Sequence, residues 1–322
     1  GHLVSVYERD SKIGGLLRYG IPDFKLEKSI IDRRIEILIL EGIKFKTNTE
    51  IGTDVPIKKL KKDNDIVLLC GGATLMRNLP IPGHELNGIV QAMRFLKRQN
   101  QVIGENFSKV EELNAKNKNV IVIGGGDTGS DCIGTSNRQG AKSVLNFEIL
   151  PKPSKQRTVE NPWPYWPFTL KTSSSHEEGS KRQWSILTKE FIDDGNGNVK
   201  ALKTVEVEWI KKLDESPKLV EIEGSEKTWP CDLVLLALGF TGPDKEIIND
   251  LKLNSDNTSK PFTTKYQTSD KKVFAAGDLR RGQSLIVWAI SEGREAAYEI
   301  DKFLMGSTEL ASKVHGDLPS VK

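Results

Sequence analysis

Residues 119–129 read Asn-Val-Ile-Val-Ile-Gly-Gly-Gly-Asp-Thr-Gly, an apolar run that breaks into glycines, with Gly124, Gly126 and Gly129 at characteristic spacing. The run is typical of a buried parallel strand, and a helical segment follows it. In such a strand–turn–helix, the first glycine permits a tight turn, the second lets the backbone approach a pyrophosphate, and the third lets helix pack on strand. The N–H groups that begin the helix then face the phosphates. The stretch predicts a dinucleotide-binding unit, against the alternative of an ordinary strand–helix turn.

The next strand supports this interpretation because it ends in an acid. Ser143-Val-Leu-Asn-Phe-Glu148 places a carboxylate about 20 residues past the glycines, where it accepts hydrogen bonds from an adenosine ribose. A later segment, residues 232–239, has an acid, an apolar run and a terminal glycine, the same pattern as residues 65–72. The residues predicted to bind this first dinucleotide are Gly124, Gly125, Gly126, Asp127, Thr128, Gly129, Glu148 and Gly239. The family resemblance described below implies that this dinucleotide is NAD.

Length and composition are those of a soluble protein with two domains of ordinary size. The chain has 322 residues, of which 37% are hydrophobic and 28% charged, and no apolar run is long enough to cross a bilayer. The 47 basic and 44 acidic residues are interspersed and give a net charge of +3. Because this leaves no basic stripe, we expect neither membrane insertion nor nucleic-acid binding.

The cysteines indicate no metal site and no redox dithiol. Cys70, Cys132 and Cys231 lie far apart and form no Cys-x-x-Cys pair. We therefore predict three buried structural thiols and no metal ligands. Free thiols suit a reducing compartment, for which the cytoplasm is the default.

The N-terminal residues predict a second nucleotide-binding unit. His2-Leu-Val-Ser-Val-Tyr-Glu8 alternates like a strand and ends in an acid, as residues 143–148 do; the alternative is a surface strand with a chance glutamate. On the first interpretation, the opening strand, glycine loop and helix lie before residue 1, and Glu8 holds a ribose. Residues 13–22 (Ile-Gly-Gly-Leu-Leu-Arg-Tyr-Gly-Ile-Pro) then predict a Gly-rich loop against a flat aromatic ligand.

Hydrophobic periodicity predicts the remaining elements. Helices are expected at 57–62, 88–101, 129–139 and 284–304, together with an amphipathic core helix at 26–40. Parallel strands are expected at 65–72 and 232–239, two runs of matching design that imply two similar sheets. Further strands are expected at 43–51, 183–191, 199–209, 218–223 and 272–278, with a hairpin at 193–198. The Pro-rich segment 151–167 predicts a surface loop pinned by its own indoles, the alternative being a partner or substrate contact.

We therefore predict an α/β fold with two Rossmann-like (doubly wound, three-layer) nucleotide-binding domains, the second inserted in the first, and an antiparallel β insert. The predicted bounds are 1–115 for the first part of one nucleotide-binding domain, 116–249 for the second nucleotide-binding domain, 250–306 for the return segment of the first, and 307–322 for a polar tail. The family resemblance described next implies that the first is an FAD-binding domain and the second an NAD-binding domain.

Five motifs resemble those of glutamate synthase small subunits over nearly the whole chain. They are Gly-Gly-Leu-Leu at 14–17, Tyr-Gly-Ile-Pro at 19–22, Gly-Gly-Gly-Asp-Thr-Gly at 124–129, Ala-Gly-Asp at 276–278 and Trp-Ala-Ile-Ser-Glu-Gly-Arg at 288–294. The motifs are shared by a wider group of flavin-dependent pyridine-nucleotide reductases. The Pro-Trp loop, residues 161–167, is similar to that of the NADH-type enzymes, in which this region ends a fused polypeptide.

The resemblance implies that NADH passes a hydride to FAD, with the cofactors carrying the chemistry and no catalytic side chain. Electrons would leave through iron–sulfur clusters and FMN outside this chain, in a glutaminase/FMN-containing large portion that makes L-glutamate from glutamine and 2-oxoglutarate. Arg280 and Arg281 stay open between flavin, nicotinamide and a partner acid. The residues implied to bind FAD are Glu8, Gly14, Gly15, Leu16, Gly71, Gly72, Gly277, Asp278, Ser284 and Leu285.

NADH is expected over NADPH. NADPH-using relatives carry an Arg pair after the second strand, where this chain has Ile149 and Leu150, and Glu148 would repel a 2′-phosphate. The rivals are a ferredoxin-type reductase, the flavin module of a pyrimidine-reducing enzyme, or a non-catalytic assembly subunit. Intact glycines and both acids argue against the last. Because the opening strand is expected outside this chain, we expect the isolated chain to hold FAD poorly.

Overall fold

The computed structural model describes residues 1–105, 113–165, 167–210 and 217–312. Trp166 of the Pro-Trp loop and residues 313–322 of the predicted tail lie outside these ranges. The chain forms two compact units. Unit 1 comprises Gly1–Ile13, Ile35–Arg77 and Gly239–Pro319, and unit 2 is built on Gly14–Arg34 and Asn78–Leu238. Which nucleotide each domain binds stays a prediction, as do the domain bounds given above.

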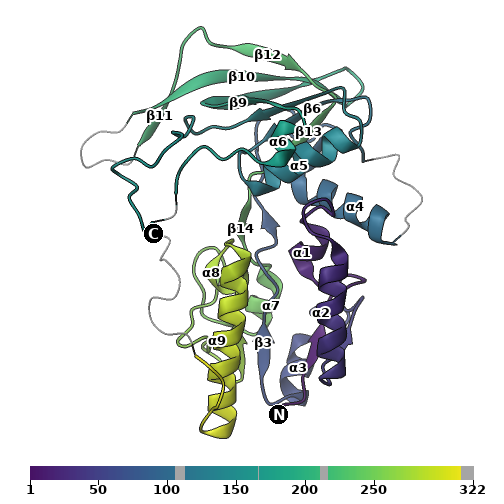
Figure 1. Ribbon diagram of the computed structural model, residues 1–322, viewed down its shortest axis with the longest axis vertical. Helices are drawn as coiled ribbons and strands as arrows, with labels where there is room; N and C mark the ends of the chain where they lie inside the picture. Colours follow the sequence, from purple (N-terminus) through teal and green to yellow (C-terminus); the bar gives the residue numbers. More distant parts are fainter. Residues whose placement is uncertain (106–112, 166, 211–216, 313–322) are drawn as a thin grey trace. The chain divides into compact units, whose positions relative to one another are not determined.

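Unit 2 is built around a five-stranded parallel sheet (Figure 1). Its central strands are short and buried on both faces, as Val120 to Ile123 illustrate, which is why they read as continuous apolar runs. In spatial order the strands are β5 (Ile89–Gln91), β13 (Leu233–Leu236), β6 (Asn119–Ile123), β7 (Ser143–Phe147) and β8 (Lys181–Gln183).

Helices cover one face of this sheet and a second sheet covers the other. Helices α4 (Ala92–Glu105) and α5 (Asp127–Arg138) bury Phe95 and Ile133 against Val122 of β6. On the opposite face, Phe191 and Leu202 pack against β6, β7 and β13. The second sheet is antiparallel, with β10 (Val199–Ile210) pairing β9 (Ile186–Asp193), β11 (Lys218–Glu221) and β12 (Lys227–Pro230). The predicted antiparallel insert thus forms one of the three layers.

Two short segments of unit 2 differ from the sequence prediction. The glycine-rich segment 13–22, predicted as a loop, contains helix α1 (Gly15–Tyr19). The helix predicted from residue 88 begins at Ala92, because Ile89–Gln91 pair with β13 as strand β5. A further short helix of this unit is α6 (Ser174–Glu177).

Unit 1 contains three strand pairs. Two pairs are parallel and one is antiparallel: β1 (Ser5–Tyr7) with β2 (Lys44–Lys46), β3 (Val67–Leu69) with β15 (Val273–Ala275), and β4 (Leu75–Met76) with β14 (Phe240–Gly242). The two parallel strands of matching sequence design, β3 and β13, therefore lie in sheets of different size. The prediction of two similar sheets is correct in strand direction but not in extent.

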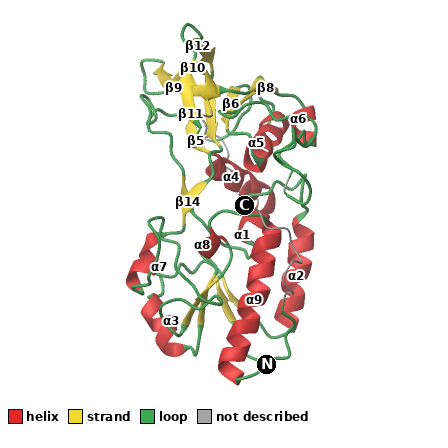
Figure 2. Ribbon diagram, turned by 90° about the vertical axis from the view of Figure 1, so that its left-hand side faces the viewer, coloured by secondary structure: helices red, strands yellow, loops and turns green. Residues whose placement is uncertain are grey.

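Helices lie on both sides of the β3–β15 pair, as Figure 2 shows. On one side, Ile57 of α3 (Ile57–Asp63) and Ile248 of α7 (Lys245–Asp250) pack against Val273. On the other side, Phe303 of α9 (Ile286–Met305) meets Phe274, with ring centroids 5.9 Å apart. Short helix α8 (Asp278–Arg281) connects β15 to α9.

Helix α2 (Lys28–Leu40) forms where predicted, but it is not a core helix. Ile31 is its one buried residue among the described positions, whereas Leu40 is 86% exposed. The chain leaves the helix at Gly42, whose φ of +96° favours glycine, and Ile43 N donates to Leu38 O at 3.0 Å. Helical spacing of apolar residues defines a face, but it does not ensure that the face is covered.

The cysteine prediction is correct for two residues. Cys132 and Cys231 are buried, and burial raises the pKa of the Cys231 thiol to about 12. Cys70 is exposed, so the prediction of a third buried thiol is wrong. In the part of the chain that the structure describes, no helix is long and apolar enough to span a membrane, and no cluster of His, Cys, Asp and Glu is suited to a metal ion.

The turn from β6 into α5 depends on close backbone contacts. Gly124 has a φ of +119°, and a Cβ there would lie 2.3 Å from Ala237 O. A Cβ at Gly129 would lie 2.3 Å from Gly124 O. Because no side chain fits at these distances, glycines at 124 and 129 fix how closely α5 approaches the sheet.

Gly129→Ala should destabilise the protein by about 2 kcal/mol, since the methyl group meets a backbone carbonyl that cannot turn away. Gly126→Ala is the matched control, because a Cβ there meets nothing within 4 Å and the φ is −80°. Urea unfolding followed by fluorescence measures both. Equal free energies of unfolding for the two variants would contradict the proposed contact.

A buried carboxylate joins α9 to the end of β15. Glu292 is 2% exposed, and it accepts hydrogen bonds from Gly277 N at 2.8 Å and from the Nε atoms of Arg280 at 3.1 Å and Arg281 at 2.8 Å. Charge-assisted bonds of this kind are strong where they are shielded from water. Glu292 therefore holds the turn after β15 against α9.

Glu292→Gln should lower the free energy of unfolding by about 2 kcal/mol, because the amide puts a donor in front of two guanidinium groups and leaves their charge unbalanced. Glu299→Gln makes the same chemical change on the same helix away from this cluster and should have little effect. Thermal and urea unfolding of both variants test this; an equal, small loss in the two would show that the buried ion pairs contribute nothing.

Candidate functional site

The strand-end acid of unit 2 lies directly against the glycine turn. A Cβ at Gly125 would be 2.2 Å from Glu148 Oε2, so the carboxylate occupies the space that the missing side chain leaves. Glu148 is held there by backbone bonds, with its N donating to Gln183 O at 2.9 Å, and by Leu150 N, which donates to Oε1 at 3.2 Å. We call Gly124–Gly126 with Glu148 the nucleotide cradle.

The cradle is open at Gly126, its last glycine. Nothing lies within 4 Å of a Cβ built at Gly126, and Gly126 and Asp127 are exposed. Within the described residues, no side chain caps the start of α5, so its first N–H groups are available to a ligand. An exposed glycine before an uncapped helix is the geometry that lets a phosphate approach the backbone. The carboxylate of Asp127 opposes an anion there, so binding depends on the N–H donors.

A buried asparagine on the neighbouring strand stabilises the turn through hydrogen bonds. Asn146, in the middle of β7, is 2% exposed, and its Nδ2 donates to Val122 O at 3.1 Å and to Gly124 O at 2.9 Å. These bonds satisfy two carbonyls at the point where β6 ends. Asn146 therefore fixes the position of Gly124 relative to β7, and with it the distance to Glu148.

One cation lies close enough to Glu148 to interact with it. Burial lowers the pKa of Arg182, and the negative charge of Glu148 partly offsets that shift. Arg182 belongs to β8, and its Nη1 donates to Lys171 O at 2.9 Å. Ile149 and Leu150, which follow Glu148, are partly or largely exposed and apolar. The acid end of the cradle thus combines one carboxylate, one guanidinium and an apolar rim.

A polar network attaches the segment after α1 to the first turns of α5. Lys25 Nζ lies 3.0 Å from Ser130 Oγ and 2.6 Å from Asp131 Oδ1. Ser130 Oγ is 2.6 Å from Ser173 Oγ, which is 2.9 Å from His176 Nδ1. Burial lowers the pKa of His176 to about 4, aided by the charges of Arg182 and Lys25, so the ring is neutral at pH 7 and Nδ1 accepts.

In unit 1, the parallel pair β3–β15 brings several predicted FAD residues to one edge, because carboxyl ends of parallel strands coincide. Ala276 N donates to Leu69 O at 3.1 Å, and Asp278 accepts a hydrogen bond from Ser284 Oγ at 2.7 Å. Burial raises the pKa of Asp278, and the hydrogen bond from Ser284 offsets part of this rise. The predicted residues gathered at this edge are Gly71, Gly72, Gly277, Asp278, Ser284 and Leu285.

The other predicted residues are placed separately. Glu8 follows β1 in unit 1, where its Oε1 accepts from Asp10 N at 2.9 Å. Gly14, Gly15 and Leu16 belong to unit 2 and form the start of α1 rather than a loop, with Leu16 48% exposed. Gly239 is the first residue of unit 1 after Leu238 of unit 2, and its carbonyl accepts from Arg77 N at 2.9 Å.

Arg280 and Arg281, left open by the sequence, have partners inside unit 1. Both donate to Glu292. Their guanidinium groups also lie over aromatic rings, 4.9 Å from the centroid of Tyr266 and 4.4 Å from that of Trp288 respectively. Their charge is therefore used to position α8 and α9.

The Pro-Trp loop is not held by its indoles where the structure describes it. Trp163 is 80% exposed, while Arg157 Nη1 donates to Tyr165 O at 2.7 Å and Phe168 N donates to Asn161 Oδ1 at 2.9 Å. Sequence reasoning also missed Asn146 and the Lys25–His176 network. An asparagine inside an apolar strand is a usable signal for the first, but the second joins segments too distant in sequence to be recognised.

Comparison with known proteins places the chain in a family. Residues 182–293 match the model of the pyridine nucleotide-disulphide oxidoreductases. Over 94% of its length, the chain superposes on Mycobacterium tuberculosis FprA in complex with NADPH, covering 78% of that protein, with a TM-score of 0.72 and 15% identity. This likeness confirms the predicted α/β fold with Rossmann-like nucleotide-binding domains.

Sequence relatives are closer. The chain is 46% identical over 322 residues to glutamate synthase [NADH] of Schizosaccharomyces pombe, with 96% of the chain and 15% of the relative covered. It is 46% identical over 321 residues to the glutamate synthase [NADPH] small chain of Mycobacterium tuberculosis, covering 98% of the chain and 64% of the relative. It is 35% identical over 320 residues to a putative glutamate synthase [NADPH] small chain of Cereibacter sphaeroides, covering 97% and 74%. The chain therefore spans a fraction of the first relatives, and it belongs to the family of glutamate synthase small chains and the corresponding region of NADH-type glutamate synthases.

Proposed function

We propose that this chain is the electron-input module of a glutamate synthase, which oxidises NADH and reduces FAD. The observation that carries the proposal is the nucleotide cradle, in which the Glu148 carboxylate lies against Gly125 beside an open glycine and an uncapped helix start. This arrangement matches the needs of a dinucleotide: N–H donors for its pyrophosphate and a carboxylate for its ribose. Family membership supports the same reading.

The residues around the cradle fit NADH. Gly126 and the first N–H groups of α5 would receive the pyrophosphate, and Glu148 would accept hydrogen bonds from the adenosine ribose hydroxyls. A 2′-phosphate at that ribose would face the carboxylate of Glu148 and the apolar rim of Ile149 and Leu150, which favours NADH. Arg182 weakens the preference for NADH over NADPH, since its positive charge lies near Glu148.

The edge formed by β3 and β15 fits FAD. Gly72 has a φ of +77° and nothing within 4 Å of a Cβ, so its backbone is open to a close ligand. Asp278 and the start of α9 would bind the ribityl–pyrophosphate region, and Glu8 a ribose. When bound, FAD accepts a hydride from NADH and releases the electrons singly. The side chains of this module therefore bind and orient, and no side chain is required as acid or base.

The wider reaction belongs to the whole protein. We propose that electrons pass to iron–sulfur clusters and FMN in a glutaminase-containing large portion, which forms L-glutamate from glutamine and 2-oxoglutarate. The basis is the family, whose members are named as glutamate synthases or their small chains. Free thiols suit a reducing compartment, and we place the protein in the cytoplasm.

Anaerobic addition of NADH to the full-length protein tests the proposal in two stages. The flavin absorbance should bleach within the mixing time, and glutamine with 2-oxoglutarate should then restore it while glutamate accumulates. Without bleaching, the chain is no electron-input module. Bleaching without glutamate formation, in the presence of the large portion, would assign the chain to another reductase.

Glu148→Ala should change the cofactor preference. The wild-type protein should use NADH with a kcat/KM at least about tenfold above that for NADPH, because one close carboxylate disfavours the 2′-phosphate by about 1.4 kcal/mol. The variant should lose NADH affinity and gain NADPH affinity, measured by titration of tryptophan fluorescence and by steady-state kinetics.

Glu190→Gln is the control, since it removes an exposed acid from β9 of the same unit. It should leave both kcat/KM values unchanged. Comparable use of NADH and NADPH by the wild-type protein would refute the role given to Glu148.

A further inference from the structure

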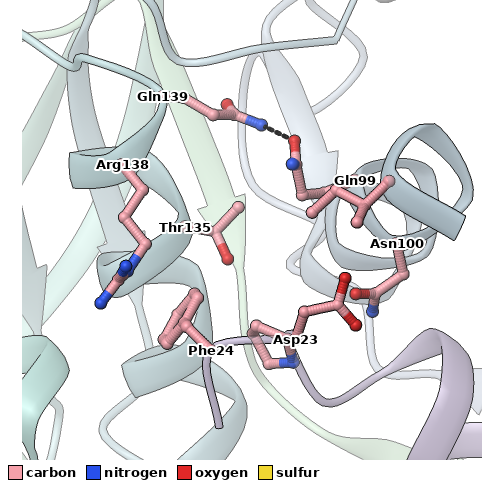
Figure 3. Close-up of a pocket in the computed structure, with 9 residues that line it drawn as sticks. Asp23, Phe24, Gln99, Asn100, Thr135, Arg138 and Gln139 are labelled. Atoms are coloured by element: carbon pink, nitrogen blue, oxygen red, sulfur yellow. Dashed lines mark hydrogen bonds between the residues drawn. The ribbon is translucent and has the colours of Figure 1, made fainter. Parts of the chain in front are cut away.

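A cavity in unit 2 is lined by residues that do not belong to the nucleotide cradle (Figure 3). Its volume is about 220 Å³, and it lies between the segment after α1, helix α4 and helix α5. Thr135, which lines it, is eight residues beyond Asp127 on α5, roughly 12 Å along the helix axis. The cavity therefore belongs to the other end of the helix whose start forms the cradle, and no role is yet assigned to it.

Two buried side chains present unpartnered oxygens here. Asn100 is 6% exposed; its Nδ2 donates to Ile21 O at 3.2 Å, but its Oδ1 has no partner among the described residues. Thr135 is 2% exposed, and its Oγ1 likewise has no partner in the described part of the chain. Buried polar atoms are rarely left without a hydrogen bond. Both side chains line the cavity.

A carboxylate supplies the third oxygen and a negative charge. Lys28 Nζ donates to the carbonyls of Leu17 at 3.1 Å, Ile21 at 2.5 Å and Leu26 at 3.2 Å. Asp23 Oδ1 forms an ion pair with Lys28 Nζ at 3.5 Å and is buried without a hydrogen bond within the described residues. Lys28 therefore balances part of the charge of Asp23, while Oδ1 keeps lone pairs that can accept a hydrogen bond. Figure 3 shows the Asp23 carboxylate and the Asn100 amide on the same side of the cavity.

The other walls are apolar or internally satisfied. Gln139 Nε2 donates to Gln99 Oε1 at 2.5 Å. The guanidinium of Arg138 lies 4.1 Å from the ring centroid of Phe24 and 2.8 Å from Glu178 Oε1, so its charge is largely offset. What the cavity offers a ligand is therefore an aromatic wall and three oxygen acceptors, one of them charged.

We propose that this cavity binds the primary ammonium group of a small organic amine. Three N–H donors match the oxygens of Asp23, Asn100 and Thr135, the positive charge matches the carboxylate, and a short hydrocarbon tail packs against Phe24. An anion is disfavoured because the Asp23 carboxylate is negative and the Asn100 carbonyl oxygen only accepts, which leaves the Thr135 hydroxyl as the one group of the three that can donate. The site is independent of the proposed NADH and FAD chemistry, since none of its residues belongs to the cradle.

The probe is n-butylammonium, titrated into the purified full-length protein at pH 7 and followed by calorimetry and saturation-transfer NMR. It should bind saturably with a Kd in the millimolar range, as befits a ligand of few atoms. Butyltrimethylammonium, which lacks N–H donors, and 1-butanol, which lacks charge, should bind at least about tenfold more weakly. NADH affinity should not change.

Variants of the lining residues distinguish binding of an ammonium group from nonspecific binding in an apolar cavity. Thr135→Val keeps the shape of the side chain and removes an acceptor, and it should weaken n-butylammonium binding by about tenfold. Asn100→Leu should have an effect of the same size, although it also removes the Nδ2 donor to Ile21 O. Asp23→Asn, in a partly exposed turn, replaces either variant if it fails to fold. Ser136→Ala is the matched control, because its buried Oγ is also unpartnered in the described region but does not line the cavity. Absence of saturable binding, equal binding of 1-butanol, or equal effects of Ser136→Ala and Thr135→Val would overturn the proposal.

Discussion

The architecture of unit 2 depends on the contact of backbone with backbone where β6 turns into α5. Ala237 O, Gly124 and Gly129 approach so closely that a Cβ at either glycine would lie 2.3 Å from a carbonyl oxygen. This approach sets where α5 begins, and hence where its unpaired N–H groups point. It also leaves Gly126 open while Glu148 fills the space beside Gly125. The turn is thus a packing constraint, and on the proposed function it is also the surface that binds the nucleotide.

That constraint explains why this part of the fold could be predicted from sequence. Glycines required by local backbone geometry leave a local signature, so β6, α5 and β7 form close to the predicted residues. The failures are short segments whose state is decided by distant partners. Ile89–Gln91 becomes a strand because β13 lies beside it, and Gly15–Tyr19 becomes a helix although its glycines favour a loop. Strand β13 is far from Ile89–Gln91 in the sequence, so a short sequence window around these residues does not reveal it.

Burial and polar contacts were harder to foresee than element positions. The periodicity of α2 predicts an apolar face, yet Leu40 is 86% exposed and Ile31 is buried. Lys25, Ser130 and His176 form one network from three separate segments, and no spacing rule connects them. Residues that support a site depend on tertiary contacts, whereas the residues proposed to face a nucleotide follow from the strand and turn that carry them. Sequence therefore identified the cradle but not its supports.

The chemistry of the proposed reaction explains the sparse use of side chains at both nucleotide edges. Hydride transfer between two bound coenzymes needs position and polarity, because the reactive atoms belong to the coenzymes. Each edge accordingly combines glycines with an acid that is proposed to bind the nucleotide, Glu148 in unit 2 and Asp278 in unit 1. The charges that remain are engaged in structure, as Arg280 and Arg281 are with Glu292. On the proposed function, cofactor selectivity would be a matter of local charge, with Glu148 disfavouring and Arg182 favouring a 2′-phosphate at the cradle.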